Sequence, residues 1–282
     1  MSQFDIQYKA LVERIINEGV WDKDQSVRTK WEDGTPAYTK SVISAQLHFD
    51  NTEPAILSCK RVAWKTAIKE ILLFWQKKSN SFEDFHKENV HIWDEWEIQE
   101  GDWKGTIGPS YGYQMGQEVR KLNGEVVDQV DYLLHQLKHN PSSRRHVTSL
   151  WNIHDLDEMA LNPCVWSTQW IVKEDKLHLI VQQRSGDVAL GVPFNVLQYQ
   201  VLQMMFAQVL GYELGTLTFN INDAHIYERH IDAIEKQING PTHDAPSLTL
   251  NEEIDNFYDF SLDDIRIENY KHEGTINFEV AI

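Results

Sequence analysis

Two kinds of hydrophobic periodicity alternate irregularly along these 282 residues, and this alternation is the feature that most constrains the fold. Residues 41–49, SVISAQLHF, alternate apolar and polar side chains as a half-buried strand does. Residues 62–77 carry apolar side chains around most of a helix surface, which predicts a buried helix. No Gly/Ser/Pro-rich linker separates such segments. We therefore expect one α+β domain over residues 1–282, built on a large mixed β-sheet flanked by helices.

Other elements follow from the same patterns, with turn residues between them. Further helices are expected at residues 4–16, 82–89, 130–137, 193–210 and 225–238. Further strands are expected at residues 146–152, 167–172, 176–184 and 215–221, and the tail from Ile265 is expected to be rich in β-structure. Residues 22–40 and 97–112 are expected to form loops.

Charge and cysteine content exclude several classes of protein. The chain carries 43 acidic and 26 basic residues, a formal charge of −17, which makes nucleic acid or an anionic membrane an unlikely partner. Two cysteines, Cys59 and Cys164, are too few for a secreted disulfide scaffold. There is no apolar run near the ~20 residues of a membrane helix, and the first residues lack a signal-peptide core. We expect a cytoplasmic protein.

Cys164 and its neighbours form the first candidate site. Cys164 lies in LNPCVWS, just before an expected strand, and a thiolate nucleophile needs a nearby cation. Arg184 on the next expected strand could supply that charge, with Gln183 and Ser185 beside it. An inert buried cysteine is the commoner outcome for this residue type alone, and we interpret Cys59 as such a structural residue.

Several charged and aromatic residues offer further hypotheses. Arg144 and Arg145 follow two serines and suit a phosphate or carboxylate, although from local sequence alone a solvated turn is the commoner explanation, and Arg28 is similarly ambiguous. Glu70 interrupts an apolar helix, so it either has a structural partner or handles protons in a pocket. His225 and Tyr227 stand two residues apart and could face one ligand.

Six sequence motifs occur together in one order. They are IWDEW at 92–96, SRR at 143–145, NPC at 162–164, QRSGD at 183–187 with GVPFN at 191–195, and DAHIY at 223–227. As a set they resemble the thymidylate synthase family, from about Arg28 to the terminal Val280-Ala281-Ile282. The resemblance implies a homodimer that packs sheet against sheet and converts dUMP to dTMP. It also implies 5,10-methylenetetrahydrofolate as the donor of carbon and hydride, without a metal.

The resemblance further implies a role for each matching residue. Cys164 would be the nucleophile, and the other catalytic residues would be Glu70, Tyr111, Arg184 and Asn195. The dUMP site would comprise Arg28, Gln183, Arg184, Ser185, Asp187, Asn195, His225 and Tyr227, with Arg144 and Arg145 reaching in from the other subunit. The folate site would comprise Lys60, Trp93, Leu161, Asp187, Leu190, Gly191, Phe194 and Ala281. The carboxylate of Ile282 would close over the site as a lid.

Four features depart from the family pattern. Val165 replaces a frequent His, Gly186 stands where Cys or Asn is common, and Asn222 replaces a Gly that would reshape a turn. The first loop is longer than usual, so the placement of Arg28 is uncertain.

Two rival functions remain. A dUMP hydroxymethylase of the same superfamily would transfer water instead of hydride, and an idle nucleotide- or RNA-binding regulator would perform no chemistry.

Overall fold

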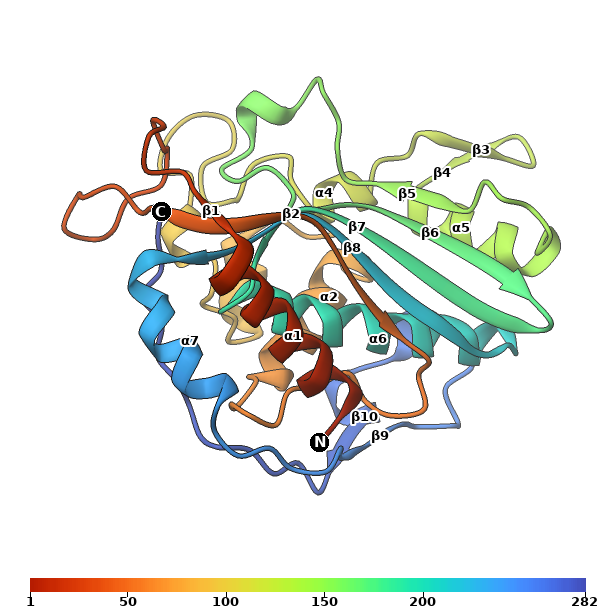
Figure 1. Cartoon of the computed structure of the whole chain (residues 1–282). Coiled ribbons are helices and arrows are strands. Elements are labelled where there is room, and N and C mark those ends of the chain that lie inside the picture. The colour runs from red at the N-terminus through yellow and green to blue at the C-terminus, as the bar shows by residue number, and fades with distance from the viewer.

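A six-stranded mixed sheet forms the centre of the structure, a computed structural model that describes residues 1–282 (Figure 1). The strand order is β1-β2-β8-β7-β6-β5, and every pair is antiparallel except β7 with β8, which is parallel. The strands are β1 Val20–Trp21, β2 Thr39–Phe49, β5 Val147–Ser149, β6 Val165–Lys173, β7 Lys176–Asp187 and β8 Glu213–Tyr227. Two small hairpins add β3 Arg120–Leu122 with β4 Glu125–Val127, and β9 Ser247–Leu250 with β10 Ile265–Glu268.

Seven α-helices accompany the sheet. They are α1 Gln3–Glu18, α2 Trp64–Trp75, α3 Phe82–Lys87, α4 Gly112–Met115, α5 Gln129–His139, α6 Gly191–Leu210 and α7 Ile231–Ile238. Short 3₁₀ turns include η1 Asp94–Trp96 and η2 Leu156–Glu158. None of these helices is both long enough and apolar enough to cross a bilayer.

The helices gather on one face of the sheet (Figure 1). Helix α6 packs against β7 and β8, α1 packs against β2, and α2 packs on α6 as a further layer. Strand β2 shows why: Ala45, Leu47 and Phe49 point into the core, while Gln46 and His48 between them are exposed on the opposite face. Helix α6 is buried around most of its circumference because it lies between the sheet and α2.

Local sequence sets the helix ends. The hydroxyls of Ser2 and Ser81 accept hydrogen bonds from backbone N–H groups in the first turns of α1 and α3. The Asp128 carboxylate does the same at the start of α5. Helix α6 ends at Gly211, whose φ of 74° is left-handed and strains any residue with a Cβ.

Most of the predicted elements are confirmed, with four corrections. The helix predicted at 225–238 begins only at Ile231, because residues 225–227 extend β8 by pairing with Thr39 and Ser41 of β2. The predicted loop at 22–40 ends at Tyr38 for the same reason. Beyond Glu268 the tail forms no strand, so the expectation of a β-rich tail was wrong. Asn222 lies within β8 and not in a turn.

Candidate active site

The candidate residues converge where β7 and β8 end and α6 begins. The two strands run parallel, so their carboxyl ends meet at one edge, where Asp187 pairs in register with His225. Helix α6 starts four residues after Asp187 and brings Asn195 to this edge in its second turn. Cys164 lies directly before β6, next to β7. Residues far apart in the sequence therefore surround one region.

Cys164 is half-buried between an arginine and a tyrosine. The Cys164 backbone N–H donates to the Tyr111 hydroxyl at 3.0 Å. Arg184 donates to the carbonyl oxygens of Pro163 at 3.0 Å and Asn162 at 2.7 Å, which clamps the NPC turn. No carboxylate of the chain pairs with Arg184, because its guanidinium donates only to these carbonyls. The guanidinium therefore keeps a net positive charge beside the thiol.

The charges around Cys164 act in opposite directions on its thiol. Burial raises the pKa of Cys164, while Arg184, the Tyr111 hydroxyl and Arg28 lower the pKa and Asp187 raises it further. Arg28 is exposed on the first loop, and its effect on the pKa of Cys164 places it on this side of the molecule. An anion bound by these arginines would cancel part of their stabilisation of the thiolate.

Tyr111 is held in a strained backbone conformation. Its φ is 40°, a region that costs roughly 1–3 kcal/mol for a residue with a side chain. The ring stacks on Phe74 at 4.8 Å and meets the edge of Trp93 at 5.1 Å. This packing directs the hydroxyl at Cys164, and burial raises its pKa well above the ordinary 10. Such strain, opposed by packing, is common at functional sites.

A chain of hydrogen bonds connects Glu70 to Asn195. The buried Glu70 carboxylate on α2 accepts from the Trp93 indole N–H at 2.5 Å and from the Gln198 amide. Gln198 accepts in turn from Asn195 Nδ2 at 3.1 Å, and Asn195 Oδ1 accepts from Gln183 Nε2 at 3.2 Å. Because Gln198 must donate to the carboxylate, its oxygen faces Asn195, and this sets the orientation of the Asn195 amide.

Gln198 was missed by the sequence analysis. It is 2% exposed on α6, and its amide also donates to the Ala67 carbonyl at 2.9 Å. A signal was present: Gln198, Gln200 and Gln203 interrupt an otherwise apolar helix, and buried amides need partners. In contrast, the Gln183 Oε1 atom is buried without any hydrogen-bond partner, so it has an acceptor available for a ligand or water.

His225 and Tyr227 face the same side of β8, as predicted. Their rings lie 5.3 Å apart, and His225 Nδ1 meets the Asp223 carboxylate at 2.9 Å. Burial raises the pKa of Tyr227 to about 12, while Arg28 lowers it, so Arg28 is also near this pair. The half-buried Ser185 and the Asp187 carboxylate complete this edge on the adjacent strand.

Several of the expected folate residues lie around the start of α6. Asp187 Oδ1 accepts from the backbone N–H groups of Ala189 at 2.8 Å and Leu190 at 3.2 Å, and Oδ2 has no partner. Lys60 is buried and donates to the Ala189 carbonyl, and burial lowers its pKa to about 8. The apolar or glycine positions are Trp93, Leu161, Leu190, Gly191, Phe194 and Ala281, of which Trp93 is buried and the others are half-buried.

The chain terminus lies against the first loop. The backbones of Lys30 and Ile282 exchange two hydrogen bonds, at 2.6 and 2.9 Å. His230 also binds the Glu279 carbonyl at 2.8 Å, and Arg229 pairs with the Glu279 carboxylate. These contacts hold the tail near Arg28, although its exposed side chains Val280 and Ile282 do not join the core.

Arg144 and Arg145 are not brought to this site within the chain. Both are exposed just before β5 at the far edge of the sheet, and neither forms an ion pair. A second copy of the chain is needed if these arginines are to act on the same ligand.

Gly186 has a packing reason for lacking a side chain. A Cβ there would lie 2.7 Å from the Ile221 Cγ2 atom and 3.0 Å from the Val192 Cγ2 atom. The β-branched side chains of β8 and α6 thus occupy the space that a Cys or Asn would need. The departure at this position is compensated locally by its neighbours.

Together, the fold and site define a class of enzyme: an α+β protein in which an arginine lies beside a half-buried cysteine, and a buried carboxylate is hydrogen-bonded through Gln198 to an oriented amide. The family model described as thymidylate synthase matches residues 6–282. Thymidylate synthase 1 from Bacillus subtilis and the thymidylate synthase of Bacillus phage phi3T are each 58% identical over 283 residues, with all of both chains covered. The solved structure of the thermostable thymidylate synthase A from Bacillus subtilis superposes with a TM-score of 0.95 at 57% identity, also over both full chains.

The chain therefore belongs to the thymidylate synthase family. It is an enzyme that methylates dUMP to give dTMP.

Glu70 predicts a pH-dependent stability. Burial raises its pKa from the ordinary 4.5 to about 7, although the bonds from Gln198 and Trp93 oppose the shift. The folded state thus prefers the protonated carboxyl, and this stabilisation is complete below pH 4.5 and lost as pH rises through about 7. The loss should amount to on the order of 3 kcal/mol of unfolding free energy.

Urea unfolding of the wild-type chain and of Glu70→Gln, measured in parallel from acidic to alkaline pH, would check this. The amide of the Glu70→Gln variant cannot ionise, so the free energy of unfolding of the variant should rise relative to that of the wild type as pH rises. A difference between the two chains that stays constant with pH would contradict a raised pKa at Glu70.

Proposed function

We propose that the chain performs a reductive methylation of dUMP in which 5,10-methylenetetrahydrofolate donates both the carbon and the hydride and leaves as dihydrofolate. The hydrogen-bonded chain from Glu70 through Gln198 to Asn195, beside the Cys164–Arg184 pair, is the observation that carries the proposal. It combines a nucleophile, a proton-handling group and a base-reading amide in one region.

Positive charge would bind the phosphate of dUMP. Arg28 and Arg184 lie on the same side of the molecule as Cys164, and neither forms an ion pair with a carboxylate. Ser185 adds a hydroxyl. Charge-assisted bonds from guanidiniums to a phosphate are short and directional. This local pocket explains how a chain of net charge −17 could hold a dianion. His225 and Tyr227 would hold the deoxyribose 3′-hydroxyl through ring nitrogen and phenol.

Cys164 would begin the reaction by adding its sulfur to carbon 6 of the uracil ring. The addition moves electrons toward oxygen 4 and makes carbon 5 nucleophilic, so that carbon 5 can form a bond to a one-carbon unit. Arg184 favours the attacking thiolate. Glu70, with a pKa near 7, could organise water and exchange protons with oxygen 4, and the Tyr111 hydroxyl, which accepts from the Cys164 N–H, would take part in removing the carbon 5 proton.

Asn195 would read the base. Its Oδ1 can accept from uracil N3–H while Nδ2 donates to oxygen 4. The Gln198 and Gln183 amides hold it in one orientation, and the unpartnered Gln183 Oε1 could accept a further donor in the pocket.

The residues around the start of α6 fit a folate. Asp187 Oδ2 is free to bond a pterin, and Trp93, Leu190 and Phe194 offer flat or apolar contacts. When bound, the folate supplies the one-carbon unit and the hydride. Trp93 and the tail residues around Ala281 would exclude water. Lys60 would have to leave the Ala189 carbonyl to meet a glutamate tail.

The product distinguishes this proposal from the rival hydroxymethylase. We expect dTMP and dihydrofolate in equal amounts when the chain is supplied with dUMP and methylenetetrahydrofolate, because no water should reach the exocyclic carbon. Mass spectrometry of the nucleotide and the absorbance of dihydrofolate measure both products. Hydroxymethyl-dUMP with tetrahydrofolate would establish the rival instead.

We also propose a homodimer with shared sites, residing in the cytoplasm. The sheet face opposite the helices carries exposed or half-exposed side chains such as Ile43, Ile180 and Thr218, a surface that a second sheet could cover. In such a dimer Arg144 and Arg145 of one subunit would reach the phosphate held by the other. Both cysteines are free thiols, which suits a reducing compartment.

Mixed dimers test the shared site. An Arg145→Ala subunit and a Cys164→Ser subunit should each be nearly inactive as homodimers. A heterodimer would restore one complete site, so exchange of the subunits should recover a substantial fraction of turnover. Labelled subunits must first show that exchange occurs, and no recovery after proven exchange would contradict shared sites.

A further inference from the structure

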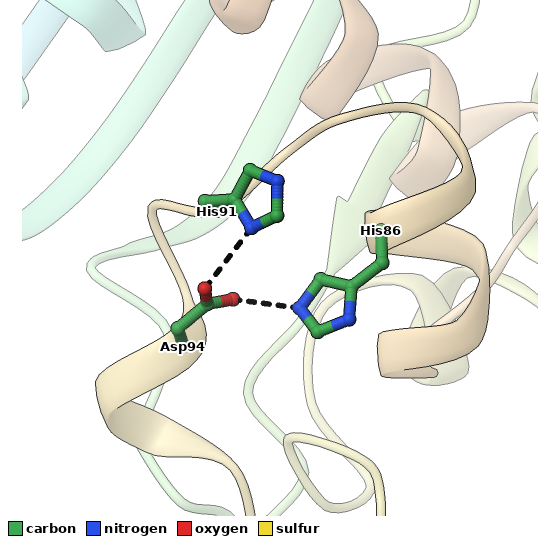
Figure 2. Close-up of side chains that lie close together, drawn as sticks. All are labelled: His86, His91 and Asp94. Atoms are coloured by element: carbon green, nitrogen blue, oxygen red, sulfur yellow. Dashed lines mark hydrogen bonds and ion pairs between the residues drawn. The ribbon is translucent and has the colours of Figure 1, made fainter.

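Two histidines and an aspartate meet on the surface outside the reaction site (Figure 2). His86 lies in α3, His91 lies in the segment that leads into η1, and Asp94 is the first residue of η1. His86 Nε2 lies 2.9 Å from Asp94 Oδ1, and His91 Nδ1 lies 3.1 Å from Asp94 Oδ2. The mechanism proposed above uses none of these three side chains.

The arrangement has the dimensions of a metal site. One ligand atom from each residue lies within 4.8 Å of the others. Ligand atoms about 2.1 Å from a tetrahedral ion are about 3.4 Å apart, so small side-chain movements would suffice. The two imidazole rings are stacked with centroids 5.0 Å apart and an interplanar angle of 26°, and both present a nitrogen to the same carboxylate.

The three side chains are accessible to solvent and lie in a region of negative charge, and both features favour binding of a cation. The side chains of His86, His91 and Asp94 are 48%, 56% and 44% exposed, so an ion could enter without opening the fold and keep water in its remaining positions. The segment from Glu83 to Glu97 contains six carboxylates and one lysine, which makes the local field negative.

We propose that His86, His91 and Asp94 bind one divalent transition-metal ion, such as Ni²⁺ or Zn²⁺, and so tie α3 to the segment that carries Trp93. Two imidazole nitrogens and one carboxylate oxygen suit these ions, whereas Mg²⁺ and Ca²⁺ prefer sites made only of oxygen. The bound ion would replace the protons that now bridge the rings and the carboxylate. Occupancy would stabilise the folded chain, since the unfolded chain does not hold the three ligands together.

Nickel binding to the full-length, untagged protein tests this site. The rings of His135 and His139 lie 4.3 Å apart on α5 and could chelate an ion independently, so His139→Ala supplies the background. In that background we expect one Ni²⁺ per chain by calorimetry or equilibrium dialysis near pH 7.5, with a raised midpoint of thermal unfolding. Adding His91→Ala or Asp94→Asn should weaken binding at least ~10-fold, since losing even an outer partner of a metal ligand costs roughly that much.

The two added substitutions allow a loss of metal binding to be distinguished from misfolding of the variant. Asp94→Asn keeps the shape of the side chain, and dUMP turnover in metal-free buffer reports whether each variant is folded. Retained Ni²⁺ affinity in both variants would overturn the proposal, as would the absence of binding at millimolar Ni²⁺. Loss of all binding in His139→Ala alone would assign the ion to α5 and overturn it too.

Discussion

Replacing Cys164 with serine should lower turnover by at least roughly 10⁴-fold, because an alcohol is a far weaker nucleophile than a thiolate at neutral pH. Binding of dUMP should change by less than ~10-fold, about 1.4 kcal/mol, since the guanidiniums and amides that would hold dUMP remain. Steady-state kinetics and calorimetric titration with dUMP measure the two effects separately.

Cys59 supplies the matched control. Its sulfur is buried beside Gln237 and burial raises its pKa to about 12, so it cannot supply a thiolate. Cys59→Ser should therefore leave the catalytic rate nearly unchanged, apart from a cost in stability. Equal losses of turnover in the two folded variants would remove the case for Cys164 as the nucleophile.

Asn195→Asp should shift base preference from dUMP toward dCMP. Cytosine has an acceptor at N3 and a donor at position 4, which reverses what uracil presents. Two mismatched hydrogen bonds in a buried site cost on the order of 2–6 kcal/mol, taking ~1–3 for each unsatisfied group, or roughly 30-fold to more than 10⁴-fold in rate. The ratio of kcat/KM for dUMP and dCMP in wild type and variant measures the shift. An unchanged ratio would show that Asn195 does not read the base.

Gln198 adds a companion test that depends on orientation alone. In the wild-type chain, rotation of the Gln198 amide would turn its N–H group away from the Glu70 carboxylate and break that hydrogen bond. The Gln198 Oε1 atom therefore stays directed at Asn195 and accepts from its Nδ2. Gln198→Met removes this restraint and leaves only the bond from Gln183 Nε2 to orient the Asn195 amide, which makes a flip of the amide easier. We expect the preference for dUMP over dCMP to fall even though Asn195 is intact.

The sequence by itself determined the fold class and the family to which the chain belongs. Period-two alternation in residues 41–49 and the apolar surface of residues 62–77 depend only on which faces are buried, so β2 and α2 could be predicted. Motifs such as NPC and QRSGD could be recognised because the chemistry requires those residue types. The long helix closed by Gly211 was predictable because only a glycine suits its left-handed end.

Other features depended on contacts between residues distant in the sequence. Residues 225–227 have a helix-like pattern, yet they extend β8 because the β2 backbone offers them hydrogen-bond partners. The role of Glu70 was ambiguous in the sequence, because only the fold brings Trp93 and Gln198 to its carboxylate. Gln198 was overlooked because the groups to which it donates, the Glu70 carboxylate and the Ala67 carbonyl, lie on another helix. His86, His91 and Asp94 lie within nine residues, but only the turn after α3 brings their ligand atoms together. The periodicity of a sequence shows which faces of a helix or strand are buried. Hydrogen-bond partners and ligand geometry arise only when distant parts of the chain fold together, so only the tertiary structure could determine them.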